Sequence, residues 1–400
     1  MTISVSGLST ESDGDFFDVS ANVRCDGRDR RMTFRRYGNH PSLRLRTDTY
    51  DPFAAALIMP AMMRGERLEI EGAVDDVLLV SLRGPIQETL RLLQPRWAKV
   101  PVNAEPRPSV DVANLTLGAA TAMSGGVDSM HMIRQRFLKA GVPQALRVQT
   151  LLHHHVGAHG DDAEFQEQRT HCQRIADRLG LPLVGTICPM GDLYQEKPFV
   201  QNAAVRNVAA AMALDHLFSS CHYASSEPIG GRPSIGRLSG IASIEPILLP
   251  YFNTPRVSWH LFGGATTRLQ KTAEVISDEA TCRDVLVCIR GSRRDRRALN
   301  CGRCYKCARL LLQAEVTGRL DVVSGLFDMD EFRAGRNHAI GRLLRFALGP
   351  SRNPVDADLI VFLVQQKFAF PWWAWPWVEL VLLSYGRQHS LEDPGYAISV

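Results

Sequence analysis

A stretch of small residues, Ser124-Gly125-Gly126, separates two segments of different periodicity and constrains the fold more than any other part of the sequence. Before it, Leu115 to Met123 is an apolar run of strand length; after it, Val127 to Ala140 has apolar residues at helical spacing. A second apolar run, Ala145 to Leu152, follows. The order strand, loop, helix, strand is typical of a parallel β-sheet covered by helices.

The residues after this unit repeat the alternation of helices and strands. Helices are expected at Asp161 to Leu179, which Gly180 closes, and at the Ala-rich segment Val200 to Phe218. Further strands are expected at Leu183 to Cys188, His222 to Ser226 and Arg256 to Phe262. We therefore predict an α/β fold for residues 113–310, an open, doubly wound parallel sheet with helices on both faces.

The two ends of the chain differ from this middle part. Alternating apolar and polar residues predict antiparallel hairpins at residues 16–48 and, around Gly72, at Leu68 to Ser81. A helix is expected at Ile86 to Leu93, followed by a proline-rich linker. Residues beyond 308 have mainly helical patterns. We predict a β-rich N-terminal domain over residues 1–112 and a helical C-terminal region over residues 311–400.

Size and composition favour a soluble protein of more than one domain. The 400 residues are 45% hydrophobic, and a net charge of +4 is too small to indicate a nucleic-acid partner. The first 17 residues contain three carboxylates instead of a basic and apolar leader, and nine cysteines are too few for a disulfide scaffold. We expect a cytoplasmic protein.

A tryptophan-rich stretch, Phe368 to Leu383, is the segment most similar to a membrane anchor. It is shorter than the roughly 20 residues that span a bilayer, and Pro371 and Pro376 interrupt it. We expect a buried aromatic cluster or a surface for a protein partner, with an interfacial anchor as the less favoured alternative, and no membrane partner.

The small-residue loop has the properties of a polyphosphate site. Ser124, Gly125 and Gly126 allow a sharp turn in which backbone N–H groups point outward where a helix begins, and Ser129 adds a hydroxyl. Asp128 can orient the loop or share in holding Mg²⁺. No lysine stands where a Gly-x-x-x-x-Gly-Lys-Ser/Thr loop requires one, so a Walker-type NTPase is not indicated.

The run Ser124-Gly125-Gly126-Val127-Asp128-Ser129 matches all five specified positions of the motif Ser-Gly-Gly-x-Asp-Ser. The chain therefore resembles the PP-loop (N-type) ATP pyrophosphatases of the adenine nucleotide alpha hydrolase-like superfamily over about residues 115–310. The resemblance implies a HUP-like domain in which the six residues of the run bind ATP. It also implies that a substrate oxygen attacks the α-phosphate, that pyrophosphate leaves into the loop, and that a nucleophile then displaces AMP.

Cations from later helices close over the phosphates in enzymes of this kind, and Arg206, Arg268 and Lys271 are candidates here. We prefer Lys271, which follows Gly263-Gly264 closely. The resemblance thus assigns catalysis to four side chains: Ser124, Asp128, Ser129 and Lys271.

Four cysteines form a second motif, Cys-x12-Cys-x2-Cys-x2-Cys, made of Cys288, Cys301, Cys304 and Cys307. Four thiolates suit a tetrahedral, structural Zn²⁺ site. The arrangement resembles the zinc site of 7-cyano-7-deazaguanine synthase-like proteins, in which both motifs occur in the same order. An iron–sulfur cluster is the alternative, and Cys282 is an alternative fourth ligand to Cys288.

Three weaker signals leave alternatives open. The run His153-His154-His155, with His159 nearby, is expected either to contact a ligand or to be buried. Neighbouring side chains on a strand point to opposite faces, so the three cannot all bind one metal. Cys188 and Cys221 are thiols for a sulfur-transfer reaction or small buried residues. The arginine-rich loop Arg290 to Arg297 binds tRNA phosphates, binds an acidic substrate or is simply solvated, and RNA is not favoured.

The expected function is that of a ligase or synthetase of the PP-loop ATP pyrophosphatase kind, which uses ATP, Mg²⁺ and Zn²⁺ in biosynthesis. It would adenylate a carbonyl or carboxylate oxygen of a small molecule for displacement by ammonia or an amine. One alternative is sulfur transfer or another modification of tRNA, and a second is a non-catalytic ATP-binding regulatory module. A homo-oligomer is compatible with the sequence.

Overall fold

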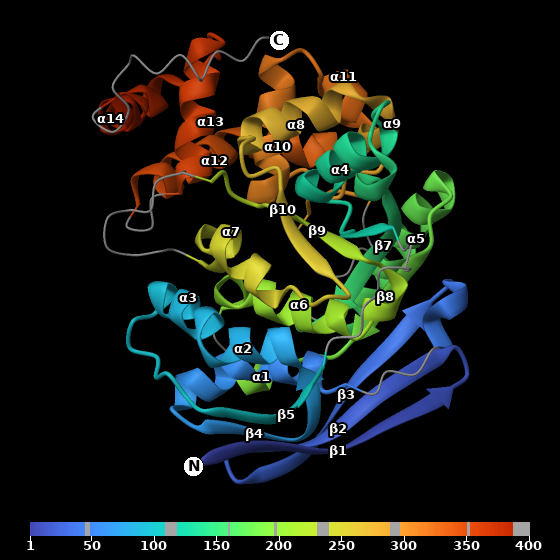
Figure 1. The fold of residues 1–400 in the computed structure, drawn as a ribbon. Coiled ribbons are helices and arrows are strands. Elements are labelled where there is room, and N and C mark those ends of the chain that lie inside the picture. The colour runs from blue at the N-terminus through green and yellow to red at the C-terminus, as the bar shows by residue number, and fades with distance from the viewer. Residues whose placement is uncertain are drawn as a thin grey trace. The chain divides into compact units, whose positions relative to one another are not determined.

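The computed structural model (Figure 1) describes residues 1–44, 49–108, 118–158, 161–195, 198–229, 240–288, 297–349 and 353–386. The chain divides into two compact units. Unit 1 contains Met1–Ser124 and Gln135–Gly264, and unit 2 contains Gly125–Arg134 and Ala265–Val400. These boundaries do not follow the three predicted segments 1–112, 113–310 and 311–400, and that division stays a prediction.

Unit 1 is built on one sheet, in which the described residues form ten strands in the order β10-β9-β6-β7-β8-β3-β2-β1-β4-β5. Neighbours are parallel from β10 to β8 and from β1 to β5, and antiparallel from β8 to β1. The strands are β1 (Thr2–Asp13), β2 (Phe16–Cys25), β3 (Arg28–Gly38), β4 (Arg67–Asp75), β5 (Val102–Arg107), β6 (Ala119–Ala122), β7 (Val148–His155), β8 (Leu183–Ile187), β9 (Ser220–Ala224) and β10 (Ser258–Phe262). The predicted α/β fold with a mainly parallel sheet is confirmed.

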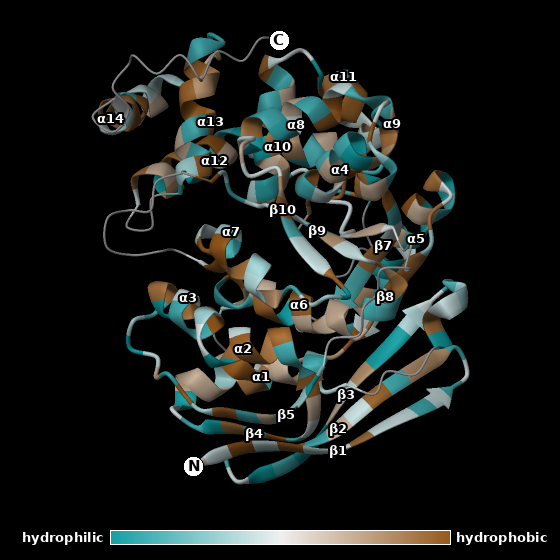
Figure 2. Cartoon of the chain, in the orientation of Figure 1, coloured by the Kyte–Doolittle hydropathy of each residue, from teal (hydrophilic) through white to brown (hydrophobic). Residues whose placement is uncertain are grey.

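The N-terminal strands extend the central sheet, because β3 pairs with β8 through partners such as Tyr37 and Gly185. The hairpin predicted at residues 16–48 is present as β2 and β3, and Figure 2 shows the alternating hydropathy along them. The hairpin predicted around Gly72 is wrong. Leu68 lies on β4, which is a single strand, and a helix follows it, because the Asp75 carboxylate accepts hydrogen bonds from the N–H groups of Val77 and Leu78.

Helices cover both faces of the sheet in unit 1. They are α1 (Asp51–Arg64), α2 (Asp76–Arg83), α3 (Pro85–Leu93), α5 (Asp162–Leu179), α6 (Ala203–Met212) and α7 (Glu245–Leu248). On one face, His153 and His155 stack on Phe165 of α5; on the other, the Thr186 hydroxyl donates to the carbonyl of Ala210 on α6. The helix α1 packs against α6 and is apolar nearly all round (Figure 2), which is typical of a central buried helix.

Unit 2 is helical in its described residues. Its helices are α4 (Val127–Ile133), α8 (Arg268–Ser277), α9 (Glu279–Cys282), α10 (Tyr305–Val316), α11 (Leu320–Ser324), α12 (Met329–Leu348), α13 (Pro354–Gln365) and α14 (Trp375–Gly386). The helix that follows the small-residue loop, α4, packs against α8 and α9, although it is far from them in sequence. The helical pattern predicted beyond residue 308 is present in α10 to α14.

The tryptophan-rich stretch is divided between a buried and an exposed side. Phe368 and Phe370 are buried with their ring centroids 4.9 Å apart, whereas Trp372 is 85% exposed and Trp377 is 53% exposed. In the part of the chain that the structure describes, no helix combines the length and the apolar character needed to cross a membrane.

Candidate functional site

The small-residue loop lies between the end of β6 and the start of α4. Gly125 has φ of 72°, in the left-handed region that residues with a Cβ rarely adopt, so the turn requires glycine there. Gly126 immediately precedes the helix, whose first residue is Val127. The sequence therefore supplies a sharp change of direction where a buried strand ends.

The carbonyl groups at the start of this loop accept hydrogen bonds from side chains of unit 1. His153 Nδ1 lies 3.1 Å from the Met123 carbonyl and must donate to it, and Cys172 Sγ lies 3.4 Å from the same oxygen. Gln168 Nε2, on α5, donates to the Ser124 carbonyl at 3.2 Å. Side chains of β7 and α5 thus fix the orientation of two successive peptide groups.

The next two carbonyls accept hydrogen bonds within unit 2. The N–H of Leu286 donates to Gly125 at 2.8 Å, and Gly126 accepts from Ser129 Oγ and from the N–H of Met130, each at 2.9 Å. In a planar trans peptide the N–H points opposite to the C=O. Hydrogen bonds to four successive carbonyls therefore fix the orientation of these peptides, so the directions of their N–H groups are set before any ligand binds.

Three charged side chains of unit 2 meet directly after the loop. The Asp128 carboxylate accepts a hydrogen bond from Arg268 Nη1, and Lys271 Nζ lies 3.7 Å from its Oδ1. Lys271 is only 2% exposed. Asp128 Oδ1 is shielded from solvent and has no hydrogen bond in the described structure, so the Lys271 ammonium is its nearest charged neighbour among the ion pairs described.

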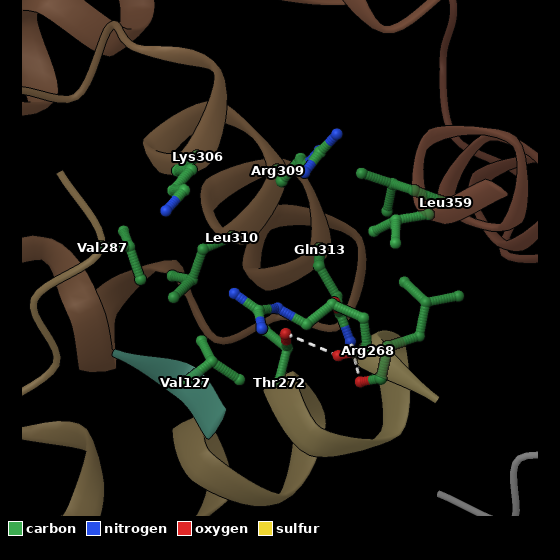
Figure 3. A pocket seen from close by; sticks show the side chains of 11 residues that line it. Val127, Arg268, Thr272, Val287, Lys306, Arg309, Leu310, Gln313 and Leu359 are labelled. Carbon is green, nitrogen blue, oxygen red and sulfur yellow. Dashed lines mark hydrogen bonds between the residues drawn. The ribbon is translucent and has the colours of Figure 1, made fainter. Parts of the chain in front are cut away.

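A pocket in unit 2 (Figure 3) adjoins this charged group and combines cationic with apolar side chains. Arg268, Lys306 and Arg309 supply the charge; Leu310 and Leu359 are among the apolar lining. Arg309 makes two 2.5 Å hydrogen bonds to the buried Asp356. Burial, and then the nearby Arg268, lower the pKa of Lys306. Sequence reasoning missed Lys306 and Arg309; the only signal was their position within and beside the cysteine motif.

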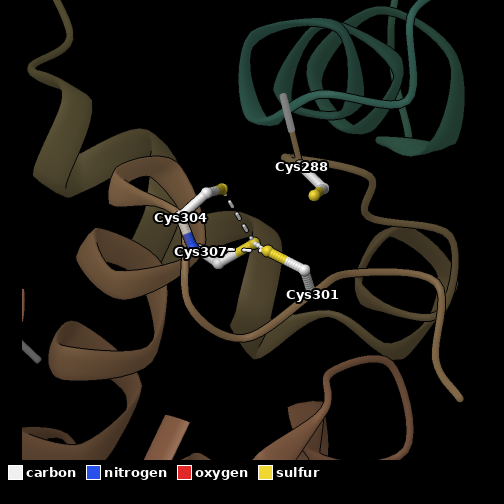
Figure 4. Close-up of side chains that lie close together, drawn as sticks. All are labelled: Cys288, Cys301, Cys304 and Cys307. Carbon is white, nitrogen blue, oxygen red and sulfur yellow. Dashed lines mark hydrogen bonds between the residues drawn. The ribbon is translucent and has the colours of Figure 1, made fainter. Parts of the chain in front are cut away.

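The four predicted cysteines form a buried cluster whose sulfur atoms all lie within 4.8 Å of one another (Figure 4). Cys301 and Cys307 are 4.0 Å apart, and Cys304 and Cys307 are 3.3 Å apart. Tetrahedral zinc with Zn–S bonds of about 2.3 Å needs sulfur atoms roughly 3.8 Å apart. The cluster could therefore hold a metal such as zinc. Cys282 is buried outside it, so Cys288 completes the set.

Two residues outside the set of thiols, Asn300 and Gly302, shape this cluster. Asn300 is fully buried; its Oδ1 accepts from the N–H groups of Val287 and Cys288, and its Nδ2 donates to Val285. It thereby ties the segment that ends at Cys288 to the loop of the other three cysteines. Gly302 has φ of 67°, and a Cβ there would lie 2.1 Å from the carbonyl oxygen of Asp328. Only glycine fits this turn.

The histidines and remaining thiols of the middle segment are mostly buried. His153 and His155 face α5, as alternation along β7 requires, and burial lowers the pKa of His154 to about 3. Burial raises the pKa of the thiols of Cys188 and Cys221, which keeps both protonated. Residues 289–296 of the arginine-rich loop, and His159, lie outside the described residues.

Comparisons with known proteins give no relative. No protein-family model, no curated protein sequence and no solved structure matches this chain. The functional argument therefore rests on the residues and geometry described above.

Proposed function

We propose that this chain is an ATP-dependent adenylating enzyme of the PP-loop ATP pyrophosphatase kind, with a HUP-like sheet, that converts ATP to AMP and pyrophosphate. The observation that carries the proposal is the loop from Ser124 to Ser129, a glycine turn between the end of β6 and the start of α4 in which the carbonyls of Met123 to Gly126 all accept hydrogen bonds. Backbone N–H groups of such a turn, at the end of a parallel strand, suit the oxygens of a polyphosphate. The matching motif Ser-Gly-Gly-x-Asp-Ser supports the same ligand.

The proposed reaction has two displacement steps. A carbonyl or carboxylate oxygen of the substrate attacks the α-phosphorus of ATP, and the bond from that phosphorus to the oxygen of pyrophosphate breaks. Ammonia or an amine then attacks the activated carbon, and AMP leaves with the transferred oxygen. The result is a new C–N bond, which makes the enzyme a ligase or synthetase.

The residues near the loop take distinct roles in this reaction. Backbone N–H groups of the loop and the hydroxyls of Ser124 and Ser129 bind the departing pyrophosphate. Lys271 and Arg268 offset the charge that develops on it, which is usually the largest contribution of such a site. Asp128 holds these two cations and offers its shielded oxygen to Mg²⁺, which would neutralise phosphate charge when bound.

The cysteine cluster is proposed to hold a structural Zn²⁺ through Cys288, Cys301, Cys304 and Cys307. The helix α10 begins directly after Cys304 and carries Lys306 and Arg309 into the pocket. A bound metal would therefore fix the first turn of that helix and the cations on it. None of the nine cysteines, all of which the structure describes, forms a disulfide, which supports our proposal of a reducing compartment such as the cytoplasm.

The test is an ATP–pyrophosphate exchange assay on the purified chain against a panel of carboxylates, nucleobases and RNA. We expect exchange with a small carboxylate or carbonyl compound, and a loss of about 100-fold or more in Ser124→Ala and Asp128→Asn, as for removal of other charge-stabilising groups. Ser324→Ala and Asp321→Asn, on α11, are the matched controls and keep the activity.

Each contrary result has its own meaning. Exchange that persists in both loop variants, or formation of ADP alone, contradicts the proposed site. A requirement for RNA together with a thiol and a brown iron–sulfur chromophore favours the tRNA-modification alternative. Nucleotide binding without AMP formation across the panel favours a regulatory module.

A further inference from the structure

Arg206, on α6 in unit 1, is a buried cation to which the described residues offer no ion-pair partner. The side chain is 2% exposed. Its Nη1 donates to the carbonyl of Val156 at 3.1 Å, whereas its Nε is shielded from solvent and has no acceptor. A guanidinium carries five N–H donors and remains charged, so burial with a single acceptor is costly unless a further group supplies acceptors.

Two aromatic rings lie close to this guanidinium. The Cζ atom lies 4.3 Å from the ring centroid of Tyr194 and 5.6 Å from that of Phe199. Such contacts offset part of the cost of burying the charge, and they hold the guanidinium plane in one orientation. The N–H donors point outward in that plane, which is the geometry that binds a carboxylate or phosphate through two parallel hydrogen bonds.

The position of Arg206 is where open α/β sheets bind their ligands. Val156 and Gly157 directly follow β7, and the short 3-10 turn Gly191–Tyr194 follows β8. The guanidinium therefore lies at the carboxyl ends of two adjacent parallel strands. Gly157 has φ of 88°, and a Cβ there would lie 3.0 Å from Nη1, so the glycine keeps a side chain away from the cation.

The neighbouring polar groups are engaged elsewhere. Burial lowers the pKa of Arg206, and the charge of Asp192 offsets this only in part, since Asp192 is 66% exposed and pairs with Arg30. The Tyr194 hydroxyl donates to the carbonyl of Ala56 at 2.7 Å. Neither group supplies the acceptors that the guanidinium edge lacks.

We propose that Arg206 anchors an oxyanion subsite in unit 1, which binds the carboxylate or phosphate group of a small-molecule ligand. The site does not depend on the proposed adenylation chemistry, because it is defined by the unpaired guanidinium, the two rings and the ends of β7 and β8. A carboxylate and a phosphate share the chemistry that the edge recognises, and the test distinguishes them.

The test is thermal unfolding of the full chain in sodium phosphate, sodium acetate and sodium chloride at equal ionic strength. A ligand that binds the folded state raises Tm with its concentration. We expect acetate or phosphate to raise Tm above its value in chloride, and Arg206→Met to lose at least half of that rise. Arg174→Met, on an exposed position of α5, is the matched control and keeps the full rise.

Phosphate can also bind the loop after β6, so only the part of the shift that Arg206→Met removes counts for the subsite. If Arg206→Met loses the rise in Tm that acetate causes, the subsite binds a carboxylate. If the variant loses only the rise that phosphate causes, the subsite binds a phosphorylated ligand. Equal shifts in wild type and Arg206→Met, or no oxyanion effect beyond chloride, overturn the proposal. If Arg206→Met does not fold, Arg206→Lys replaces it, because lysine keeps the positive charge but cannot donate two parallel hydrogen bonds. A rise in Tm in Arg206→Lys as large as in wild type would also overturn the proposal.

Discussion

His154 lies in β7 between two histidines that face α5, and neither of its ring nitrogens has a hydrogen bond in the described structure. Burial lowers its pKa to about 3, so the folded state holds a neutral imidazole. The unfolded chain has the ordinary pKa of about 6.5. Between these values the unfolded state binds one more proton than the folded state.

This difference in bound protons determines that the free energy of unfolding falls as the pH is lowered. The stabilisation from a neutral His154 is complete above about pH 6.5 and is lost as the pH falls toward the folded-state pKa. We expect His154→Leu to reduce the dependence of the unfolding free energy on pH by about 1.4 kcal/mol per pH unit between about pH 5 and 6. Urea unfolding at several pH values measures this dependence of the unfolding free energy on pH. His338→Leu, at an exposed position, should leave the slope unchanged, and an unchanged slope in His154→Leu would contradict the assignment.

At the scale of single elements, the start of α2 depends on one side chain. Asp75 ends β4, and its Oδ1 accepts from the N–H groups of Val77 at 3.1 Å and Leu78 at 3.2 Å. A capping carboxylate of this kind both stops the strand and satisfies two otherwise unpaired helix donors. The prediction of a hairpin around Gly72 was wrong because it relied on the alternation of apolar and polar residues, which does not reveal that Asp75 caps a helix.

We expect Asp75→Ala to lower the unfolding free energy by about 1–2 kcal/mol, because a buried helix start loses its cap. Asp75→Asn keeps an oxygen acceptor and removes the charge, so it should lose less than half as much. The midpoint of urea denaturation, followed by circular dichroism, measures both variants. Equal losses in the two would mean that charge, and not capping, holds this junction.

At the scale of the whole molecule, the four-cysteine cluster lies within unit 2. The segment with Cys288 and the loop with Cys301 meet there, and α10 starts from the same loop. Binding of a metal by residues that are separated in sequence contributes directly to folding free energy. Its removal should therefore loosen unit 2 and leave the sheet of unit 1 folded.

We expect the purified chain to contain about one zinc per molecule and to lose it with a chelator. Hydrogen exchange of backbone amides should then rise in α8 and α10 and stay unchanged in β2 and β3. Cys288→Ser should weaken zinc retention, whereas Cys282→Ser, which changes a buried thiol outside the cluster, should not. A Cys288→Ser protein that keeps zinc as tightly as wild type would remove Cys288 from the ligand set.

Local signals predicted several elements well. Proline at the start and amphipathic spacing gave α3, and the glycine at position 180 gave the end of α5, where φ is 66°. In contrast, nothing in the pattern indicated α1, whose residues are buried on nearly all sides and carry no amphipathic period. Its helical state follows from the packing around it.

The sequence likewise predicted some residues of the candidate site and not others. Spacing selected Cys301, Cys304 and Cys307, since two gaps of two residues bring three thiols together in one loop, and the structure confirmed Cys288 over Cys282 as the fourth. The neighbours Lys306, Arg309 and Asn300 could not be selected, because their importance depends on what lies across from them in the fold.

The sequence by itself determined the order of strands and helices around the loop, the turn that requires Gly125, and the three thiols of Cys301 to Cys307, because each depends on contacts over a few residues. Only the tertiary structure decided that β3 joins the central sheet at β8, that Asp128 meets Arg268 and Lys271, and that Arg206 is buried with no ion-pair partner among the described residues. These features come from segments far apart in the chain. Such contacts form only when the burial of the whole core offsets the entropy of closing long loops.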